Sequence, residues 1–329
     1  GIPMEFPTHP IQETGKRPTA MLDRNLSYLS LVEVLYGYPI DGVILTTGCD
    51  KTTPAALMAA ATVNIPAIVL SGGPMLDGYY KRKLSGSGTV IWEGRKLLSK
   101  KKIDYSGFMD LLSSSAPSIG HCNTMGTASS MNSLAEALGM SLTGCAVIPA
   151  PYKEREQISF ETGKRIVGMV HEDLKPSKIM TRKAFENAVV VASAIGASSN
   201  CTTHLTAIAK HMGIKFDLSN WQKLGHSIPL LANCQPAGEY LMESFYRAGG
   251  IPAIMKELMK HKKIHTNIMT VSGKNVGQNL KRKITVDRSV IKTFEECLTE
   301  KAGFLVMKSN FFSTAVMKTS VISKEFRER

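Results

Sequence analysis

Residues 41–72 read DGVILTTGCDKTTPAALMAAATVNIPAIVLSG, and the expected fold is built outward from them. The apolar run at 41–48 is short and bounded by glycine, which is typical of a buried strand. Thr53 suits a helix N-cap and Pro54 a first helical position, so we expect a helix through the alanine-rich residues 55–62. A second apolar run at 66–71 ends in Gly-Gly-Pro. Strand, helix and strand in about 30 residues predict a βαβ unit, and therefore a parallel sheet covered by helices.

The remaining chain is mostly helical in pattern until about residue 264. The spacing and the flanking glycines predict helices at 124–138, 181–195, 202–212, 238–248 and 252–261. Beyond residue 264 the pattern changes to short β-like runs at 268–271, 303–307 and 314–317. This change predicts a domain boundary between residues 290 and 300.

Composition and charge narrow the functional classes. The 329 residues are 43% apolar and 20% charged, as in a folded globular protein. The net charge of +13 is spread over short basic clusters without interleaved aromatic residues, which argues against nucleic-acid binding. The uncharged stretches 52–76 and 187–203 contain proline, glycine or polar residues, so we expect no membrane span. Six scattered cysteines without a C-x-x-C pair and without a signal-peptide pattern favour a reducing, cytoplasmic setting.

Cys49, Asp50 and Lys51 follow the first predicted strand directly. Ligands of open α/β sheets bind beyond the carboxyl ends of the strands. Cys offers a soft ligand for iron, and Asp offers a hard oxygen ligand for Mg²⁺. A lysine ammonium can pair only with an anion, unless carbamylation gives it a carboxylate-like group that can bind a metal. The tripeptide alone favours an ordinary turn, with a buried thiol, a capping Asp and a solvated Lys.

Cys122 lies in the sequence GHCNTMGTA, at residues 120–128, before a helix of small residues. A thiol at a helix N-terminus has a lowered pKa, which suits a nucleophile or a ligand of an iron–sulfur cluster. The alternative is a small buried hydrophobic residue, with the small helix residues serving only close packing.

Taken together, several segments resemble the dihydroxy-acid/phosphogluconate dehydratase family, in the family's order. They are CDKTTPA at 49–55, SGGPM at 71–75, GHCNTMGTA at 120–128, GASSN at 196–200 with His204, QPAG at 235–238 and AGGIP at 248–252. The early stretch containing Glu13 and the segment NCQPAGEYLME at 233–243 look like the branch that acts on sugar acids such as arabinonate or xylonate. The resemblance implies an α/β fold: a three-layer α/β/α domain with a mainly parallel sheet over 1–295, and the first strands of a truncated β-barrel over 296–329.

The resemblance also implies a chemistry. Family members dehydrate a 2,3-dihydroxy acid to a 2-keto acid with an iron–sulfur cluster and Mg²⁺. For this chain the resemblance favours a [2Fe–2S] cluster over an oxygen-labile [4Fe–4S] cluster. Cys49 and Cys122 match cluster ligands, whereas Glu13, Asp50 and Lys51, the last after carbamylation, match the Mg²⁺ site. Asn200 and His204 are candidates for the substrate pocket, although a helix cap and a core histidine fit them as well.

The chain departs from the family pattern at both ends. A third cluster cysteine is expected before Gly1, and the segment with the serine base and a late Mg²⁺ glutamate is expected beyond Arg329. We therefore expect a fragment of a longer dehydratase, inactive alone, whose parent is a homodimer or homotetramer. The alternatives are a dihydroxy-acid dehydratase of branched-chain amino-acid synthesis, which needs an apolar rather than a polar pocket wall, and a non-catalytic relic.

Overall fold

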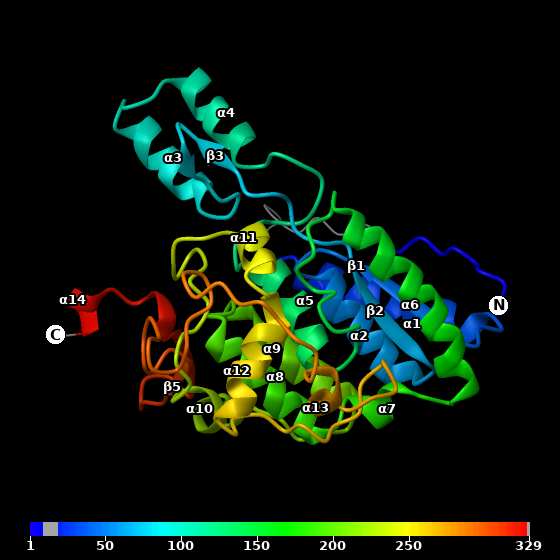
Figure 1. Ribbon diagram of the computed structural model, residues 1–329. Coiled ribbons are helices and arrows are strands. Elements are labelled where there is room, and N and C mark those ends of the chain that lie inside the picture. The colour runs from blue at the N-terminus through cyan, green and yellow to red at the C-terminus, as the bar shows by residue number, and fades with distance from the viewer. Residues whose placement is uncertain (9–18, 328–329) are drawn as a thin grey trace.

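The computed structural model describes residues 1–8 and 19–327 and contains the predicted βαβ unit. It consists of β1 (Val43–Thr47), α2 (Thr52–Val63) and β2 (Ala67–Ser71). The two strands pair in parallel, with Val43 opposite Ala67 and Thr47 opposite Ser71, so their carboxyl ends lie side by side (Figure 1). This edge of the sheet is therefore the place where the loops after both strands meet.

The predicted start of α2 is two residues too late, and the predicted side-chain cap is absent. The helix begins at Thr52, Lys51 is its N-cap, and no side chain caps it. The Thr53 hydroxyl instead donates to the carbonyl oxygen of Cys49, 3.2 Å away. Pro54 is tolerated as the third residue of the helix because the first N–H groups of a helix have no intrahelical partner.

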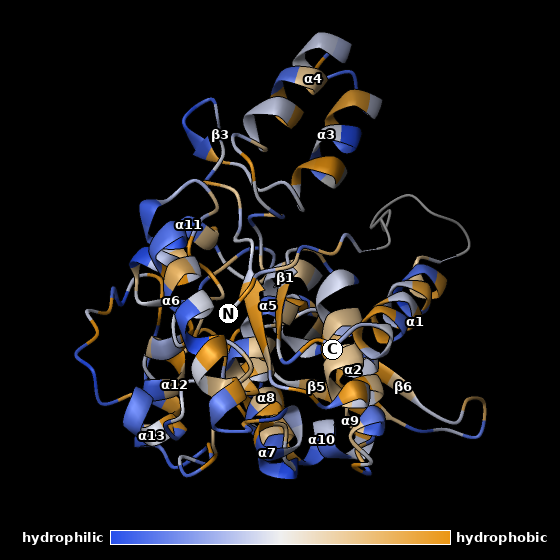
Figure 2. Ribbon diagram, turned by 90° about the vertical axis from the view of Figure 1, so that its right-hand side faces the viewer, coloured by the Kyte–Doolittle hydropathy of each residue, from blue (hydrophilic) through white to orange (hydrophobic). Residues whose placement is uncertain are grey.

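The described part of the chain is an α/β structure in which helices outweigh strands. Among the described residues each sheet is two-stranded, and β1 with β2 is the parallel strand pair, beside isolated parallel bridges at Pro74–His121 and Cys234–Tyr240. Helix α6 (Lys153–His171) packs on both strands, α2 packs on β1, and α1 (Met21–Gly37) packs on α2. Figure 2 shows the apolar residues gathered around these strands and the helices beside them.

A second group of helices completes the body. It comprises α5 (Thr127–Ala137), α7 (Pro176–Ile179), α8 (Arg182–Ala194), α9 (Asn200–His211), α10 (Leu218–Gly225), α11 (Met242–Arg247), α12 (Gly250–Lys260) and α13 (Val276–Asn279). Helix α5 is buried from Ala128 to Ala137, which its alanine and serine side chains permit because they let neighbouring helices approach closely. The predicted β-like run at 268–271 is not a strand: Met269 forms only an isolated bridge with Asn275.

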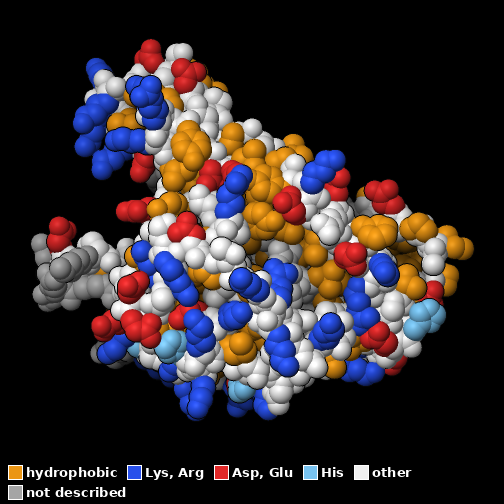
Figure 3. All heavy atoms as spheres, viewed as in Figure 1, with side chains coloured by type: hydrophobic (Ala, Val, Ile, Leu, Met, Phe, Trp, Pro, Cys, Tyr) orange, Lys and Arg blue, Asp and Glu red, His pale blue; other side chains and the backbone are white. Residues whose placement is uncertain are grey.

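Residues 79–114 form an arm that projects from this body (Figure 1). The arm consists of the hairpin β3 (Tyr79–Tyr80) and β4 (Lys83–Leu84), followed by α3 (Val90–Ser99) and α4 (Tyr105–Ser114). Its basic clusters at 81–83 and 100–102 are solvent-exposed, and Lys and Arg side chains gather on this lobe in Figure 3. Asp77 attaches the arm to the body, because its carboxylate accepts hydrogen bonds from the Glu243 and Ser244 N–H groups at the start of α11.

A hairpin lies near the carboxyl end of the described chain. Strands β5 (Phe304–Met307) and β6 (Ala315–Lys318) pair antiparallel and are followed by a 3₁₀ turn (Thr319–Val321) and α14 (Lys324–Arg327). Phe304 packs edge-on against Trp221 of α10, with ring centroids 5.0 Å apart. Within the described residues, no helix combines the length and apolarity that crossing a bilayer requires.

Candidate active site

The first loop of the candidate site joins β1 to α2 and contains Cys49, Asp50 and Lys51. The Thr52 hydroxyl accepts a hydrogen bond from the Cys49 N–H at 3.1 Å and lies 3.2 Å from its carbonyl oxygen. Asn132 of α5 donates to the carbonyl oxygen of Gly48 at 3.0 Å. Among the described residues, local hydrogen bonds shape this loop and the Asn132 side chain connects it to α5.

Asp50 and Lys51 form an ion pair in this loop. Lys51 Nζ lies 2.8 Å from Asp50 Oδ2, and both side chains are largely buried. The other oxygen, Asp50 Oδ1, is buried and has no hydrogen-bond partner among the described residues. A buried carboxylate oxygen without a donor is costly, and a hard cation is one group that would satisfy it.

The second loop, which contains Cys122, lies between the arm and α5. Its backbone is bonded to the end of β2: His121 N–H donates to the carbonyl oxygen of Gly73 at 3.0 Å, and Met75 N–H donates to that of His121 at 2.9 Å. The hydroxyl of Ser129 donates to the Cys122 carbonyl oxygen. The expectation that Cys122 sits at the helix N-terminus is wrong, because α5 begins at Thr127.

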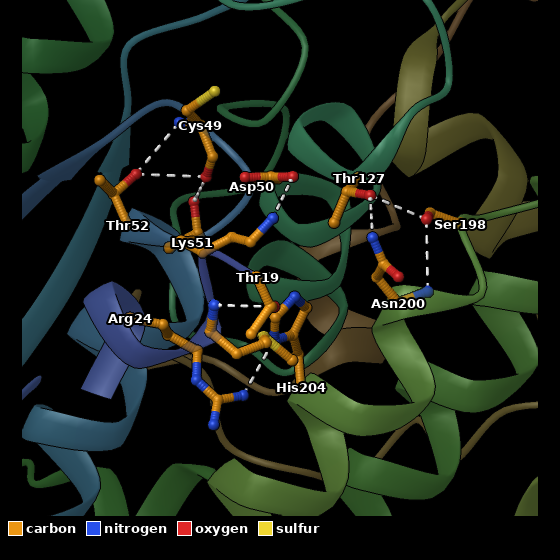
Figure 4. Close-up of polar contacts among 12 residues, drawn as sticks. Thr19, Arg24, Cys49, Asp50, Lys51, Thr52, Thr127, Ser198, Asn200 and His204 are labelled. Atoms are coloured by element: carbon orange, nitrogen blue, oxygen red, sulfur yellow. Dashed lines mark hydrogen bonds and ion pairs between the residues drawn. The ribbon is translucent and has the colours of Figure 1, made fainter. Parts of the chain in front are cut away.

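A third loop reaches α5 from the start of α9. Thr127 Oγ1 lies 2.8 Å from Ser198 Oγ and accepts from the Asn200 side chain at 3.0 Å (Figure 4). The Asn200 amide therefore bonds to α5 rather than capping its own helix. Helix α5 connects all three loops, and α2, α5 and α9 begin where they meet. The positive ends of three helix dipoles favour an anionic ligand there.

The six cysteines fall into different environments, and the structure contains no disulfide among them. Cys145, Cys201 and Cys234 are buried, and burial raises the pKa of each thiol, to about 12 for Cys201. Cys49, Cys122 and Cys297 are half-buried. Because the thiolate is the metal ligand, the buried three are poorly suited to that role and fit a packing role.

His204 of α9 is fully buried and lies between Arg24 of α1 and the Asp50–Lys51 pair in Figure 4. Its Nδ1 is 3.2 Å from Arg24 Nη1. Burial, together with the positive charges of Arg24 and Lys51, lowers the pKa of His204 to about 3, so the imidazole is neutral at pH 7. Arg24 was not predicted as a site residue, because nothing in its helix pattern marks this charged residue as buried.

His121 is the second buried histidine near these loops. Its Nδ1 lies 3.1 Å from the carbonyl oxygen of Cys122, which can only accept, so Nδ1 carries the proton. Burial is the main cause that lowers the pKa of His121 to about 4. Its Nε2 is buried without a hydrogen-bond partner among the described residues.

Among the described residues, the predicted ligands Cys49, Asp50 and Cys122 are not gathered into a group of three with donor atoms within 4.8 Å of one another. In the part of the chain that the structure describes, the group of three potential ligands with donor atoms within 4.8 Å of one another is Glu257, His261 and Glu295, which includes no predicted residue. Glu257 there already pairs with Lys260 and Arg288, which oppose a cation. Glu13, predicted as a further ligand, lies outside the described residues.

A family sequence model and the individual relatives of this chain point to the same family of dehydratases. The sequence model described as "Dihydroxy-acid/6-phosphogluconate dehydratase N-terminal" matches residues 1–279. D-xylonate dehydratase of Caulobacter vibrioides is 58% identical over 329 residues, which are 100% of this chain and 55% of the relative. L-arabinonate dehydratase of Rhizobium leguminosarum is 44% identical over 98% of this chain and 56% of its own length.

A dihydroxy-acid dehydratase of Caldicellulosiruptor saccharolyticus is more distant, at 38% identity over 94% of this chain and 56% of the relative. The chain thus spans about 55% of the length of the curated relatives it matches. The match of the family model to most of the chain, together with these identities, confirms the resemblance drawn from the motifs. The chain belongs to the dihydroxy-acid/6-phosphogluconate dehydratase family.

Proposed function

We propose that these residues are the N-terminal part of a hydro-lyase that removes water from a sugar acid, such as xylonate or arabinonate, and yields the 2-keto-3-deoxy acid. The observation that carries the proposal is the meeting of three loops on α5, which brings Cys49, Asp50 and Cys122 to the same edge of the sheet. The names of the relatives with 58% and 44% identity support the substrate class.

The donor set of the first two loops fits the expected cofactors. Cys49 and Cys122 are half-buried thiols, suited to hold an iron–sulfur cluster, for which we favour [2Fe–2S] over [4Fe–4S]. Asp50, whose Oδ1 lacks a donor, is suited to Mg²⁺, together with a carbamylated Lys51 and Glu13. When bound, the iron supplies a Lewis acid for the leaving hydroxyl and Mg²⁺ binds the carboxylate side of the acid.

The chain's own residues would then orient the acid. The three helix starts attract its carboxylate, and Asn200 and His204 of α9 are the candidates for polar contacts to the acid. Two of three cluster thiols and no base are identified here, so we expect no turnover by residues 1–329 alone. The serine base is expected beyond Arg329, in a β-barrel domain that begins near residue 296 with the β5–β6 hairpin, after the domain of residues 1–295.

The setting that we propose for the parent enzyme is cytoplasmic, as a homodimer or homotetramer. Its partners are small acids, with no role for nucleic acid or membranes. The second candidate is a dihydroxy-acid dehydratase of branched-chain synthesis, favoured by a relative of that name at 38% identity. The third candidate is a non-catalytic relic. It predicts that no longer protein containing these residues dehydrates any of the acids.

A chimera tests the proposal. Residues 1–329 would replace the matching segment of the Caulobacter enzyme, which supplies the remaining part of its length. We expect D-xylonate or L-arabinonate to be dehydrated at a higher kcat/KM than dihydroxy-isovalerate. Cys49→Ser and Cys122→Ser should abolish turnover, whereas Cys145→Ser should retain it. A folded, iron-loaded chimera that turns over none of the acids would overturn the proposal.

A further inference from the structure

Arg24 is a buried cation whose hydrogen-bond partners are neutral. Its residue is 8% exposed, its Nε and Nη2 donate to Asn25 Oδ1, and its Nη1 contacts His204. Within the described ranges, 1–8 and 19–327, no carboxylate lies at ion-pair distance from this guanidinium. A buried charge without a counter-ion is strongly disfavoured, so the surroundings of Arg24 call for an anion.

The contact with Arg24 determines the tautomer of His204. A guanidinium has only donors, so Nδ1 of His204, 3.2 Å away, must offer its lone pair. A neutral imidazole with a bare Nδ1 carries its hydrogen on Nε2. His121 has the opposite arrangement, because its Nδ1 donates to a carbonyl oxygen.

The Nε2–H of His204 is an unused donor. It is buried without a hydrogen-bond partner among the described residues, although most buried polar groups have one. Asp50 and Lys51 are close enough that both influence the pKa of this imidazole, and Figure 4 shows His204 between them and Arg24. The donor therefore lies at the candidate site.

We propose that Arg24 is a positioning residue that holds His204 as the Nε2–H tautomer, and that this N–H donates to an oxygen of a carboxylate-type group bound beside Asp50 and Lys51. The proposal deepens the proposed function, on which its ligand half rests. The bound group supplies the acceptor that Nε2–H lacks and the negative charge that Arg24 lacks. A histidine free to change tautomer would for part of the time present the Nε2 lone pair, which would repel the same oxygen.

Two sources supply such a group. One is the carboxylate of the acid substrate. The other is a carbamate on Lys51, formed when the neutral amine attacks CO₂: an N–C bond forms, one C=O electron pair moves to oxygen, and an amine proton passes to solvent. The experiment separates them with D-xylonate in one arm and bicarbonate in the other.

The first measurement reads the tautomer in the metal-free chain of 329 residues, labelled with ¹⁵N-histidine. We expect the ring nitrogens of His204, assigned by loss of the signal in His204→Gln, to show a bare Nδ1 and a protonated Nε2 at pH 7. Arg24→Met should convert this signal to a mixture of tautomers, and Arg24→Lys should restore part of it. A mixed tautomer in the wild type, or an unchanged one in Arg24→Met, would overturn the positioning role.

The second measurement adds the two carboxylate sources. D-xylonate, bicarbonate or both should shift the Nε2–H resonance, and Lys51→Met should remove only the bicarbonate effect. For the source that binds, His204→Phe should weaken the affinity by about 10- to 100-fold, as for a lost hydrogen bond to a charged group. If neither probe moves the resonance, the carboxylate assignment is wrong.

Matched variants separate positioning from folding. His211→Gln changes a histidine of the same helix whose Nδ1 contacts Thr62, and Arg182→Met removes a surface arginine. Both should leave the His204 tautomer unchanged, and thermal unfolding identifies any variant that fails to fold. The tautomer is measured without metal or turnover, so an inactive chimera would refute the dehydratase proposal and leave the positioning role standing.

Discussion

Within residues 1–8 and 19–327, the backbone around Cys49 bonds mainly to near neighbours and to Asn132 of α5, whereas the loop of Cys122 bonds to several distant segments. The Cys49 backbone bonds to Thr52 and Thr53, its near neighbours. The loop of Cys122 bonds to Gly73 after β2, to Ser87 in the arm, and to residues 235 and 242 of the body. A local loop tolerates change elsewhere in the chain, but the position of Cys122 depends on several separate segments at once.

The largest effect is expected from Gly73→Ala, which breaks the support of the second loop. Gly73 has φ of +87°, and a Cβ there would lie 2.2 Å from the Ile148 carbonyl oxygen and 2.9 Å from the Ala150 nitrogen. Backbone cannot move aside cheaply, so we expect a loss of about 4 kcal/mol in the free energy of unfolding, measured by urea denaturation. Gly163→Ala in α6 has open space around its Cβ and should stabilise by about 0.5–1 kcal/mol.

Asn123→Ala should weaken the same loop with its backbone intact. The buried Asn123 side chain accepts from Ser87 N–H at 2.8 Å and donates to the Leu76 carbonyl oxygen at 2.8 Å. Removing this side chain leaves buried groups unpaired, so we expect the free energy of unfolding to fall by about 2–4 kcal/mol. A thiol reagent, with sites assigned by mass spectrometry, should then label Cys122 faster and Cys49 at the wild-type rate. Equal acceleration at both thiols would show that the loops are not independent.

The next prediction uses α5, which supports both loops. Glu136 of α5 accepts from the Gly144 and Ala146 N–H groups, but burial outweighs these bonds and raises its pKa to about 7. The folded state therefore binds more protons than the unfolded state between pH 4.5 and 7, so this group's stabilising contribution falls as pH rises through that range.

Across this pH range we expect the free energy of unfolding to fall by about 1–3 kcal/mol because of Glu136, measured by denaturation at a series of pH values. Glu136→Gln should remove this contribution. As pH rises, Cys49 and Cys122 should both become more reactive toward the thiol reagent. Part of this rise comes from thiolate formation, and the rise in Glu136→Gln measures that part. The remainder should be shared by both thiols. A response of Cys122 alone would contradict the shared role of α5.

The smallest effect is expected from Thr52→Val in the first loop. The variant removes the hydroxyl that contacts both backbone groups of Cys49, in a half-buried place where water replaces it. We expect the free energy of unfolding to fall by about 1 kcal/mol. The thiol reagent should label Cys49 faster and Cys122 at the wild-type rate. If the free energy of unfolding fell as much as in Asn123→Ala, the proposed difference between the two loops would be wrong.

The sequence predicted the βαβ unit and the site loop after β1 because both depend on neighbouring residues: a glycine-bounded apolar run, then alanine-rich helix. It misplaced Cys122 at a helix N-terminus because the five residues before Thr127 follow tertiary hydrogen bonds that no local pattern encodes. Arg24 was missed for a related reason. Its role arises from contact with His204, 180 positions away, and its burial depends on how α1, α2 and α9 pack.

Reconstitution with iron and sulfide under anaerobic conditions tests the central claim, that Cys49 and Cys122 act as one ligand pair. The chain and its Cys145→Ser variant should bind iron and sulfide in equal amounts and show the visible absorption of a cluster. Cys49→Ser and Cys122→Ser should each lose that absorption, although they retain the wild-type unfolding midpoint. Iron and sulfide binding that survives both substitutions, or depends on only one of these thiols, would contradict the account.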